Sequence, residues 1–416
     1  MTVREEVKAL CDNAAAAAAK LALADTEKKN GVLLRIADIL TENAEAILSA
    51  NAKDLENAKD NGVPSAMLDR LKLTEARIEA ICASVRDIAA LDDPIGKGES
   101  WTRPSGLEIQ RVRVPLGVVG MIYEARPNVT VDSAVLCLKT GNAVVLRGGK
   151  EAINTNVALV EAIKKALSDC GLDPHGVELI TNTDRESAQA LMTMRGSIDV
   201  LIPRGGKGLI KSVTENATVP VIETGAGNCH LYIDDSADID MALSIATNAK
   251  CSRPSVCNAV ETVLVHAGVA AKFLPAFAEQ MAKYSVEIRG CAKTRVLVST
   301  AIPATEEDYY TEYNDYIVAV RVVDTLADAI SHINKHSTSH SEAIVTSSEE
   351  HAEKFQREVN SAAVYVNAST RFTDGGEFGF GAEIGISTQK LHVRGPMGLS
   401  ALTTEKYLIR GNGSVR

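Results

Sequence analysis

The sequence predicts an α/β protein built from two parallel-sheet domains. Short apolar runs alternate with helical patterns from residue 118 to residue 366, which is typical of parallel strands joined by crossover helices. A glycine-containing turn at residues 223–230 divides this alternation into two blocks. The chain has 416 residues, 45% of them hydrophobic and 24% charged, so it is long enough for two or three domains and too apolar to be disordered.

The first hundred residues predict helices. Apolar residues recur at the spacing i, i+3, i+4, i+7 over 33–40, and a second stripe runs over 78–88 with Thr74 placed to cap it. The alanine-rich stretch 14–24 predicts a helix rather than a signal peptide, because Lys20 interrupts it.

The next segment predicts β-structure outside the two blocks. Residues 101–106 include Pro104 and have the composition of a connector. From Leu107 to Val114 apolar residues alternate with polar ones through one phase slip. That pattern indicates either a strand with a bulge or one arm of a hairpin.

The apolar runs of the two blocks are the candidate strands. In the first block they are 118–122, 143–146, 177–180, 200–202 and 219–222. In the second block they are 231–233, 260–265, 317–323, 343–345 and 363–366. Helical patterns between them supply the crossovers that a parallel sheet requires.

The composition excludes several classes of function. Lys and Arg number 44 against 54 Asp and Glu, and a net charge of −10 does not attract DNA or anionic lipid to the chain as a whole. Aromatic residues are only 4% of the chain, which argues against a base-stacking surface. No apolar run approaches the roughly 20 residues that span a bilayer. We therefore expect neither a nucleic-acid partner nor a membrane.

Two turns are candidate phosphate sites, although the fingerprint G-x-G-x-x-G is absent after any predicted strand. Arg147-Gly148-Gly149-Lys150 follows one strand and Arg204-Gly205-Gly206-Lys207 follows another, and both open a helix. Backbone amides at a helix N-terminus beside Arg and Lys suit a phosphate. Two ordinary turns between strand and helix remain the alternative.

The cysteines indicate a compartment and a candidate nucleophile. Eight cysteines are scattered without a C-x-x-C pair, which predicts reduced thiols and a cytoplasmic protein. Cys257 lies in a loop before a strand and close to Arg253, whose charge would favour the thiolate. Cys229 and Cys251 are also candidates, and composition does not choose among the three.

Three histidines invite a comparison with a metal site. His332, His336 and His340 have i, i+4, i+8 spacing, but residues 337–339 are expected to end the helix before His340, and no carboxylate completes the set. We expect a solvated helix face and no metal.

Residues 223–257 resemble a known family. Glu223-Thr-Gly225-Ala-Gly227 followed by Cys257, 257 − 223 = 34 residues later, is similar to the glutamate–glycine–glycine element and catalytic cysteine of the aldehyde dehydrogenase superfamily. Residues 141–147 resemble its cofactor strand, with Arg147 in place of the usual Lys. Residues 312–316 stand in the place of its glutamate–x–phenylalanine–glycine–proline element, with Glu312 kept.

The resemblance implies an aldehyde dehydrogenase-like α/β fold with two parallel-sheet domains and a β-arm for oligomerisation. It places an NADP-binding domain at 1–104 and 116–226 and a catalytic domain at 227–385. The oligomerisation arm and tail are then 105–115 and 386–416. A homo-oligomer, either a dimer or a tetramer, is implied as well.

Three strings resemble one branch of that superfamily, the reductases of γ-glutamyl phosphate. They are residues 123–130, 253–258 and 394–399. This branch implies the NADPH-dependent reduction of L-glutamyl 5-phosphate to L-glutamate 5-semialdehyde and phosphate through a cysteine thioester. That reaction is the second step of proline biosynthesis from glutamate, so a transient contact with glutamate 5-kinase is a further candidate partnership.

The resemblance also implies the roles of individual residues. The catalytic set is Cys257 as nucleophile, Asn128 as oxyanion donor and Glu223 as a proton shuttle or a group turned away. The cofactor-binding set is Arg147, Gly148, Lys150, Gly205, Gly206, Gly225 and Glu312. Arg126, Arg253, Arg371 and Arg394 are the arginines of the family-like strings, and Arg126, Arg253 and Arg394 are the predicted substrate ligands.

Two other functions compete with this one. An ordinary aldehyde dehydrogenase would release a free acid, and its aldehyde oxidation would not depend on phosphate. A non-catalytic member would use the fold for binding or assembly, and it would lack a single fast-reacting thiol.

Overall fold

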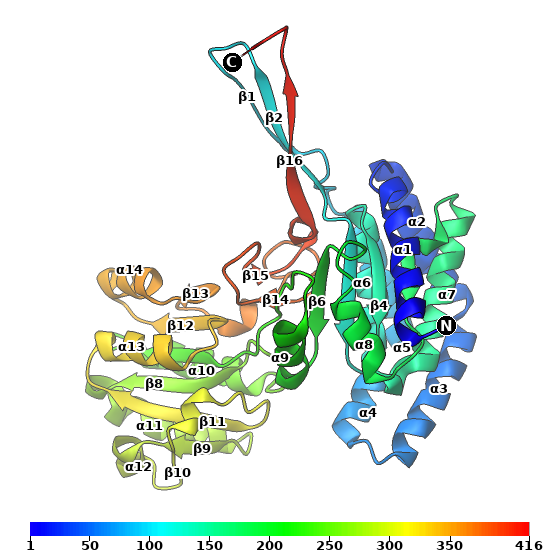
Figure 1. Cartoon of the computed structure of the whole chain (residues 1–416). Coiled ribbons are helices and arrows are strands. Elements are labelled where there is room, and N and C mark those ends of the chain that lie inside the picture. The colour runs from blue at the N-terminus through cyan, green and yellow to red at the C-terminus, as the bar shows by residue number, and fades with distance from the viewer. Residues whose placement is uncertain (416) are drawn as a thin grey trace. The chain divides into compact units, whose positions relative to one another are not determined.

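The computed structural model describes residues 1–415, and these residues divide into two compact units (Figure 1). Unit 1 comprises 1–223, 380–385 and 397–416, and unit 2 comprises 224–379 and 386–396. Among the described residues no helix is both long enough and apolar enough to cross a membrane.

The helices at the start of unit 1 confirm the helical prediction. They are α1 (Val3–Leu21), α2 (Thr26–Glu42), α3 (Ala44–Asp60), α4 (Ser65–Leu71) and α5 (Glu75–Ala90). Thr74 accepts a hydrogen bond from the Arg77 amide and caps α5 as expected. The alanine-rich stretch forms most of α1, which opens with a capping box between Thr2 and Glu5.

The sheet of unit 1 is parallel, with the order β5-β4-β3-β6. Its strands are β3 (Val118–Tyr123), β4 (Ala143–Arg147), β5 (Val177–Leu179) and β6 (Val200–Arg204). The connecting helices are α6 (Pro127–Lys139), α7 (Ile153–Asp169) after the short η1 (Lys150–Ala152), and α8 (Arg185–Met192). The short η2 (Pro174–Gly176) precedes β5, and α9 (Lys207–Asn216) follows β6. Every residue of β3 is buried, as expected for a strand covered on both faces.

One predicted strand of unit 1 is wrong. Residues 219–222 form a single isolated bridge, between Leu201 and Val221. Leu201 donates to the Pro220 carbonyl and accepts from the Ile222 amide, so the segment pairs along one side only. Pro220 has no N–H to donate to a further strand, which is why an apolar run here does not become one.

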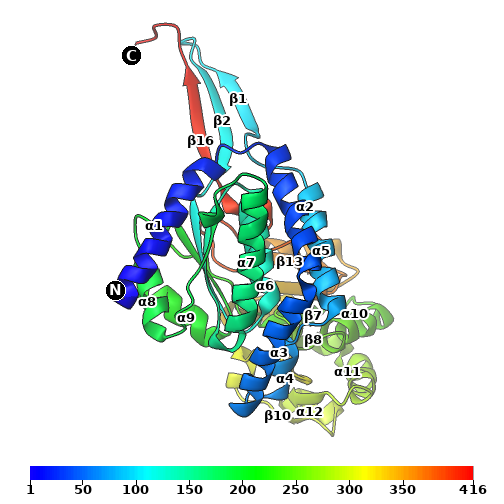
Figure 2. The same cartoon turned by 90° about the vertical axis from the view of Figure 1, so that its right-hand side faces the viewer.

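A three-stranded antiparallel sheet projects from the rest of unit 1 (Figures 1 and 2). It contains β1 (Gly98–Thr102), β2 (Glu108–Pro115) and β16 (Thr403–Arg410). The register of β2 with both neighbours runs without a slip, so β2 is a hairpin arm rather than a bulged strand. The predicted connector at 101–106 is partly wrong, because Trp101 and Thr102 belong to β1.

The sheet of unit 2 is parallel, with the order β10-β9-β11-β8-β7-β12-β13. Its strands are β7 (Cys229–Ile233), β8 (Val260–His266), β9 (Glu287–Gly290), β10 (Ile302–Pro303), β11 (Ile317–Val323), β12 (Ser341–Val345) and β13 (Ala363–Val366). The helices are α10 (Ile239–Cys251), α11 (Ala267–Ala282), α12 (Ala292–Leu297), α13 (Leu326–His336) and α14 (Glu349–Glu358), with the short η3 (Glu307–Tyr310) and η4 (Thr370–Phe372). The five predicted strands of this block are confirmed, and β9 and β10 are additional.

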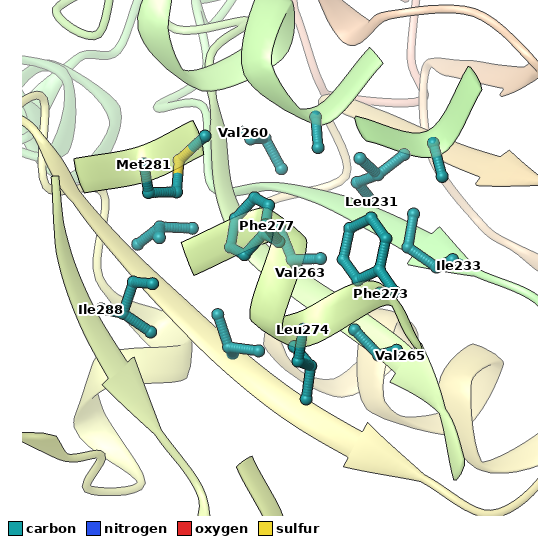
Figure 3. Close-up of a cluster of buried hydrophobic side chains, with 14 of the residues drawn as sticks. Leu231, Ile233, Val260, Val263, Val265, Phe273, Leu274, Phe277, Met281 and Ile288 are labelled. Atoms are coloured by element: carbon teal, nitrogen blue, oxygen red, sulfur yellow. The ribbon is translucent and has the colours of Figure 1, made fainter. Parts of the chain in front are cut away.

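A dense apolar core fixes the strands of unit 2 that carry the candidate nucleophile. Phe273 and Phe277 of α11 stack with their ring centroids 5.3 Å apart and are fully buried against β7 and β8 (Figure 3). Val263 and Leu231 of those strands are also fully buried. Because such a core is close-packed, it holds the start of β8, and the loop before it, in one position.

The unit boundary lies at 223/224, whereas the sequence placed the domain boundary at 226/227. The predicted tail from residue 386 is also divided differently. Its first part, 386–396, belongs to unit 2, where β14 (Ile386–Ser387) pairs with β15 (Gly395–Pro396) and Gly225 donates to the Ile386 carbonyl. The rest returns to unit 1 as η5 (Leu399–Leu402) and β16.

Candidate active site

Cys257 lies in the loop between α10 and β8 of unit 2, with its side chain half-buried. The other two candidate cysteines are buried. Burial raises the pKa of Cys229 well above its ordinary value and that of Cys251 to about 11. A buried thiol with a raised pKa is a poor nucleophile, so Cys257 is the best placed of the three.

The backbone of Cys257 packs directly on Gly227. A Cβ atom at residue 227 would lie 1.5 Å from the Cys257 carbonyl oxygen, so only glycine fits there. The thiol of Cys229 donates to the same carbonyl at 3.2 Å. The segment that enters β7 therefore fixes the main chain of Cys257.

Glu312 is the next residue in this arrangement. Its Oε1 accepts a hydrogen bond from the Gly227 amide at 2.8 Å, so this predicted cofactor residue supports the glycine beneath Cys257. Gly225, another predicted cofactor residue, packs against Thr388, whose Cγ2 would lie 2.3 Å from an added Cβ.

After Glu312, Tyr313 takes the variable position, and Asn314 stands where the family has phenylalanine. The Tyr313 hydroxyl donates to Asp308 at 2.9 Å, and the Arg289 guanidinium lies 5.1 Å from the centre of its ring. Asn314 adopts a left-handed backbone, with φ of 55°, and its amide donates to Glu261 at 3.2 Å. The contacts of Tyr313 and Asn314 with Asp308, Arg289 and Glu261 thus hold the segment that carries Glu312 in place.

A fully buried ion pair lies behind this segment. Lys250 Nζ and Glu261 Oε2 are 2.5 Å apart, and neither side chain is exposed. Burial raises the pKa of Glu261, against the opposing charge of Lys250. The sequence analysis missed this pair, and its signal was a single carboxylate in the apolar run 260–265.

The predicted substrate arginines of unit 2 have different surroundings. Arg253 is exposed in the Cys257 loop. Arg394 donates to the carbonyl oxygen and the side-chain oxygen of Asn360, at 3.0 and 3.3 Å. Arg371 donates through Nε to Ser252 at 3.1 Å and through Nη1 to Asn258, so it contacts the Cys257 loop directly.

In unit 1, the turn after β4 contains two cations, Arg147, which is hydrogen-bonded within the protein, and Lys150, which is exposed. The Arg147 guanidinium donates to the carbonyls of Thr183 and Asp184, and burial lowers its pKa. Lys150 is exposed at the start of η1. A Cβ at Gly148 would lie 2.3 Å from Asn156, so the glycine permits close packing of this turn.

The turn after β6 places an anion at the N-terminus of α9. The Gly206 amide donates to Glu124 Oε1 at 2.9 Å, and a Cβ at Gly205 would lie 2.6 Å from the Glu124 carboxyl carbon. A carboxylate oxygen therefore already occupies the position where a helix N-terminus binds an anion. The sequence analysis missed Glu124, because nothing near it in the chain indicates that its partner is Gly206.

The remaining predicted residues of unit 1 lie around α6 and at the end of the unit. Arg126 is the N-cap residue of α6, and Asn128 is exposed in its first turn with Nδ2 donating to Asp132 at 3.1 Å. Burial raises the pKa of Asp132 to about 6. Glu223 is the half-buried last residue before the unit boundary.

The prediction of a solvated histidine face is wrong. His332, His336 and His340 are 6%, 4% and 0% exposed. The His332 ring stacks on His336, with the centroids 4.0 Å apart, and meets Tyr309 edge to face. The helix does end at His336 as expected, and within residues 1–415 the three rings are not a converging group of metal ligands.

The family is established by comparison of the whole chain with known proteins. Residues 2–314 match the model of the aldehyde dehydrogenase family, so the chain belongs to that family. A protein named gamma-glutamyl phosphate reductase from Caldanaerobacter subterraneus is 54% identical over 412 residues, which is 99% of this chain and all of that one. The protein of the same name from Carboxydothermus hydrogenoformans is 58% identical over 413 residues, again 99% of this chain and all of that one.

A solved structure agrees with these relatives. The crystal structure of gamma-glutamyl phosphate reductase from Thermotoga maritima superimposes with a TM-score of 0.97 at 48% identity and covers both chains completely. Within the aldehyde dehydrogenase family, the chain is thus a member of the gamma-glutamyl phosphate reductases.

Proposed function

We propose that this chain reduces L-glutamyl 5-phosphate to L-glutamate 5-semialdehyde with NADPH and releases phosphate, as in proline biosynthesis from glutamate. The observation that carries the proposal is the half-buried thiol of Cys257 in a loop that also contains Arg253 and touches Arg371. The names of the full-length relatives supply the substrate class.

The thiolate of Cys257 attacks the acyl carbon of the substrate. The new S–C bond forms, the C–O bond to phosphate breaks, and phosphate departs with the bonding electrons to leave a thioester. Cations beside a thiol favour its thiolate form, and here they also favour an anionic substrate. Arg253 and Arg371 supply that charge.

The oxyanion that forms on the acyl carbon requires hydrogen-bond donors. The backbone N–H of Cys257 is the donor nearest in the chain, and Gly227 and Cys229 keep that backbone in place. Asn128 stays a prediction for the second donor, with its amide now donating to Asp132. Glu223 stays a prediction for the proton shuttle.

The glycine turns of unit 1 fit a dinucleotide phosphate. The turn after β6 already binds one anion. The Glu124 carboxylate oxygen accepts a hydrogen bond from the Gly206 amide, in a space that a Cβ at Gly205 would fill. When bound, NADPH supplies the hydride that reduces the thioester. Gly205 and Gly206 would hold its phosphates, with Lys150 as the exposed cation for the ribose phosphate.

Partners and location follow from the same proposal. The three-stranded arm presents exposed Tyr407 and Ile409, which supports a homo-oligomer, either a dimer or a tetramer. The eight cysteines are all free thiols, which supports a reducing cytoplasm. A transient contact with glutamate 5-kinase stays a proposal without a structural feature to carry it.

The test is NADP reduction with glutamate 5-semialdehyde, with and without inorganic phosphate. By microscopic reversibility, phosphate must accept the acyl group when the reaction runs backwards. We expect sustained NADPH formation with phosphate and a single turnover per site in a non-nucleophilic buffer. Sustained turnover without phosphate would mean that water is the acceptor, as in an ordinary aldehyde dehydrogenase, and no turnover under either condition would favour a non-catalytic member.

A further inference from the structure

We propose that Arg371 and Arg253 together bind the phosphate group of the substrate beside Cys257, and that Arg371, rather than the expected Arg394, is the second arginine of this subsite. This assignment rests on the proposed function, since it names the residues that bind the acyl phosphate. The ligand class is a phosphate monoanion or dianion, either attached to the acyl group or free as product.

The guanidinium of Arg371 lies across the loop that holds Cys257. Its Nε donates to Ser252 Oγ at 3.1 Å, and its Nη1 donates to Asn258 Oδ1. Ser252 and Asn258 are the two ends of this loop, and Asn258 directly follows the nucleophile. One planar group therefore contacts both ends of the segment that positions the thiol.

The main chain around Arg371 is fixed to the same loop. Asn258 Nδ2 donates to the carbonyls of Arg371 and Thr373 at 3.2 and 3.0 Å, and the Thr370 hydroxyl donates to the Asn258 carbonyl at 2.7 Å. Asn258 and Thr370 are buried, so these bonds are shielded from water. The position of the guanidinium is thus set before any ligand binds, which reduces the cost of ordering it on binding.

Neither cation is held in an ion pair. Within residues 1–415, the structure shows no ion pair of Arg253 or Arg371 with Asp or Glu, and the side-chain hydrogen bonds of Arg371 use Nε and Nη1. Burial and then the charge of Arg253 lower the pKa of Arg371, whereas Cys257 and Asp374 raise it. The charge of Arg253 thus repels that of Arg371, and an anion bound by both reduces that repulsion.

Arg394 contacts a different part of unit 2. Both of its terminal nitrogens donate to Asn360, so the guanidinium joins the 386–396 segment to the chain after α14. These bonds fix Arg394 to Asn360, whereas those of Arg371 fix it to the loop that holds Cys257.

The chemistry of the substrate favours phosphate over the α-carboxylate as the anion at this site. Cys257 attacks the acyl carbon, and the phosphate oxygen is bonded directly to that carbon, whereas the rest of the glutamyl chain separates the α-carboxylate from it. Cations in the Cys257 loop are therefore nearest to the phosphate. When the C–O bond breaks, they stabilise the charge that the leaving phosphate gains.

The test is the alkylation rate of Cys257 by iodoacetate and by iodoacetamide, measured on the full chain by mass spectrometry of the Cys257 peptide. In both reactions the S–C bond forms, iodide leaves and the thiol proton goes to solvent, and only iodoacetate carries a charge. The ratio of the two rates therefore reports the anion site and not the reactivity of the thiol. We expect Arg371→Gln and Arg253→Gln each to lower the ratio about tenfold.

Arg357→Gln is the matched control, because Arg357 is an exposed arginine of α14 and its loss changes the net charge equally. We expect this variant to keep the wild-type ratio and Arg371→Lys to restore part of it. Inorganic phosphate should protect the wild type from iodoacetate, and Arg371→Gln should need about tenfold more phosphate for half protection. An unchanged ratio in Arg371→Gln, or the same loss in Arg394→Gln instead, would overturn the assignment.

A second variant and an assay that is independent of turnover complete the test. If Arg371→Gln unfolds in a thermal melt, the exposed Arg253→Gln still tests the pair. Alkylation needs neither cofactor nor turnover, so phosphate-independent turnover would overturn the proposed function while the rate ratio still reports whether the two arginines bind an anion.

Discussion

At the scale of single residues, three residues hold the main chain of Cys257 in place: Gly227, Cys229 and Glu312. The thiol is half-buried, its carbonyl accepts from Cys229, and Gly227 packs beneath it while donating to Glu312. The proposed nucleophile is therefore positioned by backbone contacts that a change of its own side chain leaves intact.

Replacement of the nucleophile should separate activity from folding. We expect Cys257→Ala to lower phosphate-dependent NADP reduction at least about a thousandfold, because the thioester cannot form. The melting temperature should stay close to that of the wild type. Cys229→Ala and Cys251→Ala should keep most of the activity, and loss of activity in Cys251→Ala with Cys257→Ala still active would contradict the assignment.

Gly227→Ala tests the support beneath the nucleophile. The added Cβ would lie 1.5 Å from the Cys257 carbonyl oxygen, so the loop must move. We expect kcat to fall about a hundredfold or more, because small misplacements of a reacting group are that costly. Gly31→Ala in the exposed interior of α2 is the control, since nothing lies within 4 Å of its added Cβ and alanine favours helices. Equal kcat for the two variants would show that the support is not needed.

At the scale of elements, the two cations of the turn between β4 and η1 have different surroundings, so we expect Arg147 to stabilise the fold and Lys150 to bind the cofactor. Arg147 binds the carbonyls of Thr183 and Asp184, and Lys150 is exposed. We expect Lys150→Ala to raise the KM for NADPH about tenfold and to change the KM for NADH little, because only NADPH carries the ribose phosphate. We expect Arg147→Ala to lower the melting temperature instead. Equal effects of Lys150→Ala on both cofactors would mean that Lys150 binds a group they share.

The histidines of α13 predict a pH dependence of stability. Burial lowers the pKa of His332 to about 2, whereas the ordinary value is 6.5, so only the unfolded chain binds this proton between those limits. The free energy of unfolding therefore falls as the pH drops below 6.5, by about 2 kcal/mol between pH 7 and pH 5 for one such histidine. His332→Phe should lose that part of the pH dependence in denaturant titrations, and His392→Asn, at an exposed site, should retain it.

The elements show what local sequence can and cannot predict. The parallel strands were found because buried strands are continuous apolar runs, and β9 was missed because Glu287 and Arg289 make it polar. The burial of His332 was not predictable, because its neighbour Tyr309 comes from a distant segment. The choice between Arg371 and Arg394 likewise depends on their partners in the fold. Arg371 binds Ser252, 119 residues away in the chain, and Arg394 binds Asn360, 34 residues away.

At the scale of the whole molecule, the three-stranded arm exposes several large apolar side chains of unit 1. Trp101 and Tyr407 meet edge to face with centroids 6.4 Å apart, and the register places Ile409 opposite Ile109 on the same face. Ile409 is 60% exposed. An apolar sheet face of this kind is expected to be covered in the assembled protein.

Ile409→Asp should therefore weaken the oligomer. We expect light scattering after size exclusion to show a lower mass for this variant at micromolar concentration, with the far-ultraviolet circular dichroism unchanged. Thr404→Asp changes a residue on the opposite face of the same strand and should keep the wild-type mass. A wild-type mass for Ile409→Asp would place the contact between subunits elsewhere.

The position of β16 also determines when the arm can be completed on the ribosome. Its partner β2 ends at Pro115 and β16 begins at Thr403, so 403 − 115 − 1 = 287 residues are synthesised between the two. Until β16 leaves the exit tunnel, the nascent chain carries β1–β2 as a hairpin with one edge of β2 unpaired. Assembly through this arm must then wait until β16 has been synthesised and has paired with β2, which keeps a growing chain from joining a finished subunit too early.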